Sequence, residues 1–160
     1  MNICRAVVDT NIWVYVYLQN YVSPPPTTRY ADILAAFEAG EFTPVYCPEM
    51  FEELLYILTE SYEVAQRYKL NPVKAGAFVG RVLAKAGEEQ LLTGNLKICS
   101  DPRDDMFIET AQLAQVEYLV SNDQHLHEPA VEAYLRPYGV RVVWPGSFRA
   151  ELQRRRELGS

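Results

Sequence analysis

Ile3-Cys4-Arg5-Ala6-Val7-Val8, near the start of the chain, is a mainly apolar run, and Asp9-Thr10-Asn11 follows it directly. Such a run predicts a short buried strand, and residues 11–18 predict a helix after it. In open α/β sheets, ligands bind outside the carboxyl ends of the strands. Asp9 is therefore predicted to lie where a ligand site would form.

Strands and helices are predicted to alternate along the rest of the chain. Further short strands are predicted at 42–46, 118–121 and 139–143, with weaker candidates at 90–92 and 97–99. Helices are predicted at 28–39, 48–58, 71–85, 101–114 and 145–156. This alternation predicts an α/β fold with three layers, in which a mostly parallel central sheet of about five strands is flanked by helices on both faces. We assign residues 1–150 to one domain and 151–160 to a helix end and tail.

The composition is that of a soluble globular protein. The chain has 160 residues, 49% of them hydrophobic and 22% charged, enough to bury one core. No apolar run reaches the roughly 20 residues of a membrane span, and no signal peptide is predicted. Three scattered cysteines argue against a disulfide framework, so we expect a cytoplasmic protein. The net charge of −6 opposes nucleic-acid binding unless some of the acids hold a cation.

Acidic residues follow three separate strand candidates. Asp9 follows the first strand, Asp101 and Asp104 follow the candidate at 97–99, and Asp123 follows the strand at 118–121. Like charges gathered at one sheet edge are costly without a cation, so their convergence predicts a metal site. Two of them also have a simpler explanation, because Asp101 can cap the following helix and Asp104 can complement its dipole.

Helical spacing adds a fourth acid and separates two neighbours. Glu53 borders the apolar face of the predicted helix at 48–58, from which it can either reach an interior polar site or extend to water. Asp104 extends the face on which Phe107 lies, whereas Asp105 points away from it. We therefore prefer Asp104 to Asp105, and both interpretations of Glu53 stay open.

Four blocks of the chain resemble the PIN-domain family. They are Val-Val-Asp-Thr-Asn at 7–11, Cys-Pro-Glu-Met-Phe-Glu-Glu-Leu at 47–54, Asp-Pro-Arg-Asp-Asp-Met-Phe at 101–107 and Tyr-Leu-Val-Ser-Asn-Asp at 118–123. The blocks occur in family order, and the resemblance spans about residues 3 to 148. It is closest to bacterial PIN nucleases that are the toxins of toxin–antitoxin systems.

The resemblance implies a metal-dependent endoribonuclease that cleaves single-stranded RNA through metal-activated water. Its catalytic and metal-binding acids would be Asp9, Glu53, Asp104 and Asp123, with Asn11, Asp101 and Ser121 in supporting positions. Oxygen ligands without His or Cys favour Mg²⁺ or Mn²⁺ as the cofactor. An antitoxin partner and a homodimer are also implied. The last block has Ser-Asn-Asp where relatives often have Thr-Gly-Asp, and Asn can adopt the left-handed turn that Gly provides.

Basic and aromatic residues near these blocks are candidate contacts for RNA. Arg103, beside the acids, is a weak candidate for contacting a phosphate, whereas the arginines at 154–156 are more simply explained as a solvated helix end. Tyr15 can stack on a base, although packing is the commoner fate of such tyrosines. His125 and His127 have no cysteine partner at zinc spacing.

Other enzyme and signalling classes are excluded by residues that the chain lacks. A haloacid-dehalogenase-type phosphatase needs a second Asp where Asn11 stands, and a receiver domain needs a Lys after the strand at 118–121. A dinucleotide-binding fold needs a Gly-x-Gly-x-x-Gly turn. The remaining alternative to a nuclease is a PIN fold used as an RNA-binding or partner-binding module with little or no cleavage activity.

Overall fold

A computed structural model of the chain describes residues 3–27 and 30–159. Within them, one parallel sheet contains β1 (Cys4–Val8), β2 (Phe42–Pro44), β3 (Tyr118–Val120) and β4 (Arg141–Val143). The strand order is β2-β1-β3-β4, so β1 and β3 are central. Val8 pairs with Val120, which in turn pairs with Val143. The carboxyl ends of these three strands therefore lie side by side.

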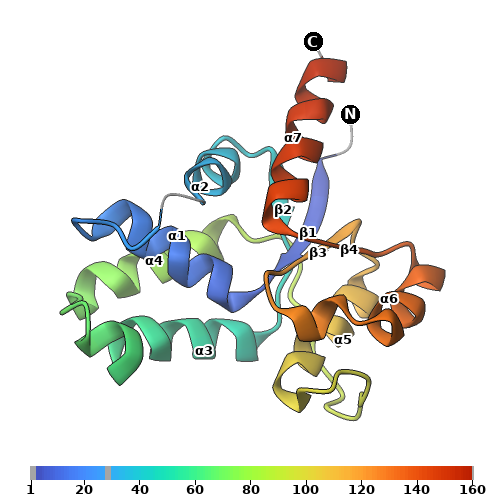
Figure 1. Cartoon of the computed structure of the whole chain (residues 1–160), viewed down its shortest axis with the longest axis horizontal. Helices are drawn as coiled ribbons and strands as arrows, with labels where there is room; N and C mark the ends of the chain where they lie inside the picture. Colours follow the sequence, from blue (N-terminus) through green and yellow to red (C-terminus); the bar gives the residue numbers. More distant parts are fainter. Residues whose placement is uncertain (1–2, 28–29, 160) are drawn as a thin grey trace.

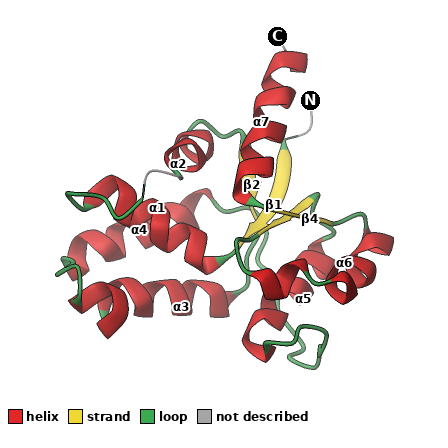
Figure 2. Ribbon diagram, viewed as in Figure 1, coloured by secondary structure: helices red, strands yellow, loops and turns green. Residues whose placement is uncertain are grey.

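Helices surround the sheet, as Figures 1 and 2 show. The α-helices are α1 (Thr10–Tyr21), α2 (Ala31–Glu38), α3 (Pro48–Thr59), α4 (Pro72–Lys85), α5 (Asp105–Ala114), α6 (Pro129–Leu135) and α7 (Pro145–Gly159). They are joined in part by a π-helical turn, η1 (Tyr62–Gln66), and by the 3₁₀ turns η2 (Pro102–Asp104), η3 (Gln124–His127) and η4 (Arg136–Tyr138). The strands, yellow in Figure 2, lie between the group of α1 to α4 and the pair of α5 and α6.

Local sequence signals set the helix boundaries. Pro48 and Pro72 are the first residues of α3 and α4, where the missing N–H removes no helical hydrogen bond. Asn71 caps α4, because its side-chain oxygen accepts hydrogen bonds from two backbone N–H groups of the first turn. Gly40, with a φ of +73°, follows the end of α2 in the left-handed conformation that glycine favours.

The two faces of the sheet bury different cores. Ala6, Val8 and Val120 belong to a core shared with α1, α2, α3, α4 and α7, whereas Val7 and Leu119 belong to a core shared with α5 and α6. Successive side chains of a strand point to opposite faces, which explains this alternation. The predicted fold class is confirmed: the chain forms an α/β structure with a parallel sheet flanked by helices.

The described residues form four strands, where about five were predicted. The candidates at 90–92 and 97–99 were wrong. The backbone N–H groups of Ile98 and Cys99 donate to the Asp105 Oδ1 atom at 3.0 and 2.8 Å. A side chain has thus taken the donors that a strand would use for its neighbour.

Several helices differ from the prediction at their boundaries. The predicted helix at 101–114 is the 3₁₀ turn η2 followed by α5, and the first two residues of the one predicted at 28–39 lie outside the described residues. Neither η1 nor α6 was predicted, because elements of five and seven residues give little periodicity. The terminal helix α7 extends to Gly159, past the end predicted at residue 156.

Candidate active site

The carboxyl ends of β1 and β3 bring Asp9 beside Ser121, two residues before Asp123. The pairing of the two strands continues past Val8, because the Asp9 N–H donates to the Val120 carbonyl at 2.9 Å. The fully buried Ser121 hydroxyl donates to Asp9 Oδ2 at 2.7 Å and accepts from the Asp123 N–H at 2.9 Å. Ser121 therefore links the two acids and fixes their relative position.

Asp9 is a buried carboxylate with two hydrogen-bond donors. It is 2% exposed, and besides Ser121 it accepts from the Asn11 N–H at 3.1 Å, so it also caps α1. Burial raises its pKa, the hydrogen bonds from Ser121 and Asn11 oppose this shift, and the charge of Asp123 adds to it. Asn11 contributes its backbone N–H to this hydrogen bond, and Asn11 itself is exposed to solvent.

Asp104, at the end of η2, interacts with both strand-end acids. It is 9% exposed, and in the described part of the chain its Oδ2 atom is buried without a hydrogen-bond partner. Burial, followed by a side-chain hydrogen bond with Asp123 and by the charges of Asp123 and Asp9, raises the pKa of this carboxyl group from 3.8 to about 8. An unpartnered buried carboxylate oxygen among other acids is an unfavourable arrangement that a cation would relieve.

Glu53 reaches the same region from α3. The residue as a whole is exposed, but desolvation and then the charge of Asp9 raise the pKa of its carboxyl group. Thr10 and Arg103 act in the opposite direction and favour the charged form. Glu53 thus shows a feature of each interpretation that the helical spacing left open: it is exposed to solvent, and its charge interacts with that of Asp9.

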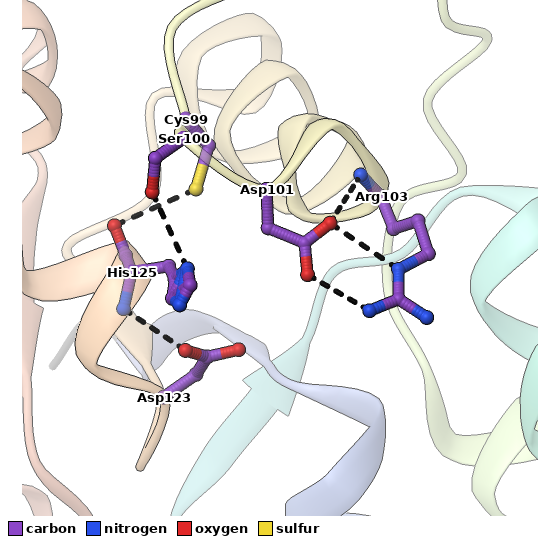
Figure 3. Close-up of polar contacts among 6 residues, drawn as sticks. All are labelled: Cys99, Ser100, Asp101, Arg103, Asp123 and His125. Carbon is purple, nitrogen blue, oxygen red and sulfur yellow. Dashed lines mark hydrogen bonds and ion pairs between the residues drawn. The ribbon is translucent and has the colours of Figure 1, made fainter.

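Asp101 is bound to Arg103, as Figure 3 shows. Its carboxylate accepts from the Arg103 backbone N–H at 3.1 Å and from the side-chain Nε and Nη2 atoms at 3.2 and 3.0 Å. The hydrogen bonds from Arg103 lower the pKa of Asp101. Asp101 thus caps η2, as the simpler of the two explanations predicted, and the Arg103 side chain, 89% exposed, remains accessible to a ligand.

Two further acids close to η2 accept hydrogen bonds from the loop before it, which the helical spacing did not predict. Asp105, 7% exposed, is occupied with the two backbone N–H groups of the preceding loop. Glu109, 4% exposed, accepts hydrogen bonds from the N–H groups of Thr93 and Gly94 and from the Thr93 hydroxyl. Both fasten the 93–99 segment to α5, which leaves Asp104 as the acid of this helix start that faces Asp9 and Asp123.

Histidines next to Asp123 extend the site beyond the predicted residues. Figure 3 shows the His125 backbone N–H donating to Asp123 Oδ1, at 2.9 Å, and the His125 ring hydrogen-bonded through Nδ1 to the Ser100 hydroxyl, at 3.3 Å. His127 stacks on Trp144 with ring centroids 3.6 Å apart, and its Nε2 atom lies 2.7 Å from the Ser121 carbonyl. Their proximity in sequence to Asp123 was the signal that could have identified both.

The chemistry of these side chains fits a hard divalent cation. Asp9, Asp104, Asp123 and Glu53 offer only carboxylate oxygens, the ligands that Mg²⁺ and Mn²⁺ prefer. In residues 3–27 and 30–159, no group of three His, Cys, Asp or Glu side chains is already arranged around a single ion position. The carboxylates would therefore have to turn toward an ion as it binds.

Comparison with known proteins identifies the family. No described helix of the chain is long and apolar enough to cross a membrane. Comparisons with curated proteins and with solved structures gave no match. A PIN-domain family model matches residues 5–125, which include β2, β3, all but the first residue of β1, and the acids Asp9, Glu53, Asp104 and Asp123. The chain belongs to the PIN-domain family.

Proposed function

We propose that this protein is a metal-dependent endoribonuclease that cleaves single-stranded RNA. PIN domains are generally nucleases and typically use divalent metals, which supports an enzyme of this class. The observation that carries the proposal is Asp104: it is buried beside Asp9 and Asp123, and its Oδ2 atom has no partner in the described part of the chain. A fold gains nothing in stability from such a group, so its presence favours a role in binding a cation.

Each acid would have a distinct part in holding Mg²⁺ or Mn²⁺. Asp9, Asp104 and Asp123 would coordinate the principal ion, and Glu53, approaching from α3, would bind it directly, through water or through a second ion. A bound divalent cation supplies the charge that polarises a phosphodiester and lowers the pKa of an attacking water. Ser121 and the Asn11 N–H hold the Asp9 carboxylate by hydrogen bonds and so limit how far it would have to turn.

Arg103 would position the RNA backbone. Its guanidinium is held by Asp101 at one edge while most of the side chain stays exposed, and its charge acts on both Asp104 and Glu53. A phosphate that approaches the acids would therefore meet a fixed positive group with free N–H donors. Asp101 would act indirectly, as the residue that orders Arg103.

Cleavage of a mixed single-stranded RNA in Mg²⁺ or Mn²⁺ tests this function. We expect 5′-phosphate products from the wild type, no cleavage in EDTA, and a loss of at least about 100-fold for Asp9→Asn. Asp32→Asn is the matched control, because Asp32 is 73% exposed and paired with Arg149 on the surface. Equal cleavage by the wild type and Asp9→Asn would refute the proposed function.

The biological context that we propose is that of a cytoplasmic toxin inhibited by an antitoxin protein, with the chain acting as a homodimer. The resemblance of the four sequence blocks to toxin members of the family supports this context, and the free, buried state of all three cysteines fits a reducing compartment. The alternative is a PIN fold that binds RNA or a partner with little or no cleavage. RNA binding without metal-dependent cleavage would favour that alternative.

A further inference from the structure

A groove begins beside the acids and runs between α1 and α3. Figure 1 shows that both helices start at the carboxyl end of the sheet and extend in the same direction away from it. The groove has a volume of about 400 Å³, within the range of about 300–1,000 Å³ that is usual for small-ligand sites. Asn11, two residues after Asp9, lines its near end, and the rest is lined by Tyr15, Tyr56, Arg67 and Tyr68 together with aliphatic residues, Ser61 and Glu63.

Tyr15 is a rigid aromatic wall of this groove. Its ring stacks on Tyr30 with centroids 5.6 Å apart and an interplanar angle of 18°. The Tyr30 hydroxyl accepts a hydrogen bond of 2.9 Å from the side chain of Asn122, the residue before Asp123. Tyr15 nevertheless remains 39% exposed. The acid site and the aromatic wall are thus connected through Asn122 and Tyr30, and little conformational entropy is left to lose when a ligand stacks on Tyr15.

The opposite wall carries aromatic rings and one cation. Tyr56 lies on α3 one helical turn after Glu53 and is 55% exposed. Arg67 lies over the Tyr68 ring, 5.4 Å from its centroid, and within the described residues its guanidinium makes no ion pair. Glu63 also lines the groove and opposes phosphate binding there. The walls therefore offer more stacking surface than positive charge.

A larger cavity, of about 630 Å³, differs from this groove in both position and charge. It lies between α7 and the amino-terminal side of the sheet, away from the acids, and Ile3, Cys4 and Leu152 contribute to it. Its three arginines are already paired: Arg154 with Glu151, Arg155 with Glu117 and Arg156 with Glu41. A phosphate would have to displace those acids.

We infer that the groove between α1 and α3 binds bases of single-stranded RNA next to the scissile phosphate, an inference that rests on the proposed function. The bases stack on Tyr15 and Tyr56, and Arg67 contacts one phosphate. The groove adjoins the acids, because Asn11 lies two residues after Asp9 and Tyr56 lies one helical turn after Glu53. Stacking on aromatic rings tolerates any base, and it supplies affinity that a chain with a net charge of −6 cannot obtain from phosphates alone.

Equilibrium binding of RNA to the full-length Asp9→Asn variant tests this inference. The probes are a fluorescent oligoadenylate and an abasic ribose-phosphate chain of the same length. We expect Tyr56→Ala to weaken oligoadenylate binding about 5- to 100-fold, and Tyr56→Phe to bind within about twofold of its parent, because stacking needs the ring and not the hydroxyl. Binding of the abasic chain should be the same for the parent and for Tyr56→Ala.

Tyr62 provides the matched control for Tyr56. It is 75% exposed, follows α3 at the start of η1 and does not line the groove, so Tyr62→Ala should bind oligoadenylate like its parent. Arg67→Gln should make the slope of log K against log salt shallower by about 0.7, the value for one phosphate contact on a single strand. Thermal unfolding of each variant verifies that it is folded.

The inference that the groove binds bases and the proposed nuclease activity can be refuted separately. If Tyr56→Ala, while folded, binds oligoadenylate as tightly as its parent, the groove is not a base site, even if the wild type cleaves RNA. A parent that prefers the abasic chain, or binds both probes equally, also overturns the inference and points to a groove for a protein partner. Base-dependent binding that Tyr56→Ala abolishes, without cleavage by the wild type, supports the groove and refutes only the nuclease.

Discussion

Replacing Asp104 by Asn should stabilise the metal-free protein while removing its activity. The substitution keeps the shape of the side chain and removes its charge. Asp104 is buried beside Asp9 and Asp123, and its Oδ2 atom has no partner in the described part of the chain. An amide at this position donates hydrogen bonds to the neighbouring carboxylates, whereas the Asp104 carboxylate repels them. Asp104, the residue proposed to bind the cation, is therefore expected to destabilise the metal-free fold.

The size and pH dependence of the effect follow from the pKa of Asp104. Its pKa is 3.8 as a reference for the unfolded chain and about 8 in the folded protein, so the folded state binds more protons between about pH 4 and pH 8. The free energy of unfolding therefore falls as the pH rises through that window and levels off above it. At about 1.4 kcal/mol per tenfold change, the full difference amounts to roughly 6 kcal/mol. Screening by water and salt reduces this to about 1–3 kcal/mol.

Urea unfolding in EDTA at pH 4 and pH 8 measures the difference. At pH 8 the Asp104→Asn variant should exceed the wild type by about 1–3 kcal/mol in free energy of unfolding, and at pH 4 the two should be nearly equal. Asp32→Asn, the exposed control, should change stability by no more than about 0.5 kcal/mol at either pH. A variant that is no more stable than the wild type at pH 8, or a difference that does not depend on pH, would refute the reasoning.

Metal addition is a second test of the charge repulsion at Asp104. Millimolar Mn²⁺ or Mg²⁺ should raise the unfolding temperature of the wild type at pH 8, because a cation relieves the repulsion that the folded state contains. Asp104→Asn should respond less, since it has lost both the repulsion and a ligand. An equal rise for the variant and the wild type would place the ion elsewhere in the protein.

Three further predictions concern the frame that holds the site. Asp105→Ala should lower the free energy of unfolding by about 1–3 kcal/mol, because it leaves two backbone N–H groups without an acceptor; urea unfolding and faster hydrogen exchange at 98–99 would show it. Asn71→Ala should cost about 1 kcal/mol through loss of the α4 cap, and an unchanged unfolding midpoint would contradict this. The buried thiols should react with a disulfide reagent at pH 8 only after denaturation, since burial raises the pKa of Cys4 to about 12 and those of Cys47 and Cys99 to about 11; rapid labelling of the native protein would disprove this.

The elements that carry the site were predictable from sequence because their signals are local. A buried apolar run followed by an acid identified β1 with Asp9 and β3 with Asp123, and a parallel sheet necessarily brings such ends to one edge. The choice of Asp104 over Asp105 rested on helical spacing, and in the structure Asp104 interacts with Asp9 and Asp123 while Asp105 is bonded elsewhere.

The features that sequence reasoning missed depend on partners far from them in the chain. Residues 97–99 are apolar enough for a strand, but Asp105 takes their N–H donors, and the pattern of that segment cannot show this. The same holds for the Glu109 contacts to the 93–94 loop. Packing was the expected fate of Tyr15, and its ring does stack on Tyr30, but the exposure that remains after folding could not be read from the sequence.

The hydrogen-bond pattern around the acids shows where a cation would be needed most. Five acids of this region each accept at least one hydrogen bond. The acceptors, each followed by its donors, are Asp9 (Ser121 and the Asn11 N–H), Asp101 (Arg103), Asp123 (the His125 N–H), Asp105 (the Ile98 and Cys99 N–H groups) and Glu109 (Thr93 and Gly94). Asp104 is the exception, because its Oδ2 atom is buried without any donor in the described part of the chain. A chain that supplies donors to so many neighbouring carboxylates could have supplied one more by a single substitution. Since it does not, stability alone does not explain Asp104, whereas the proposed cation site would.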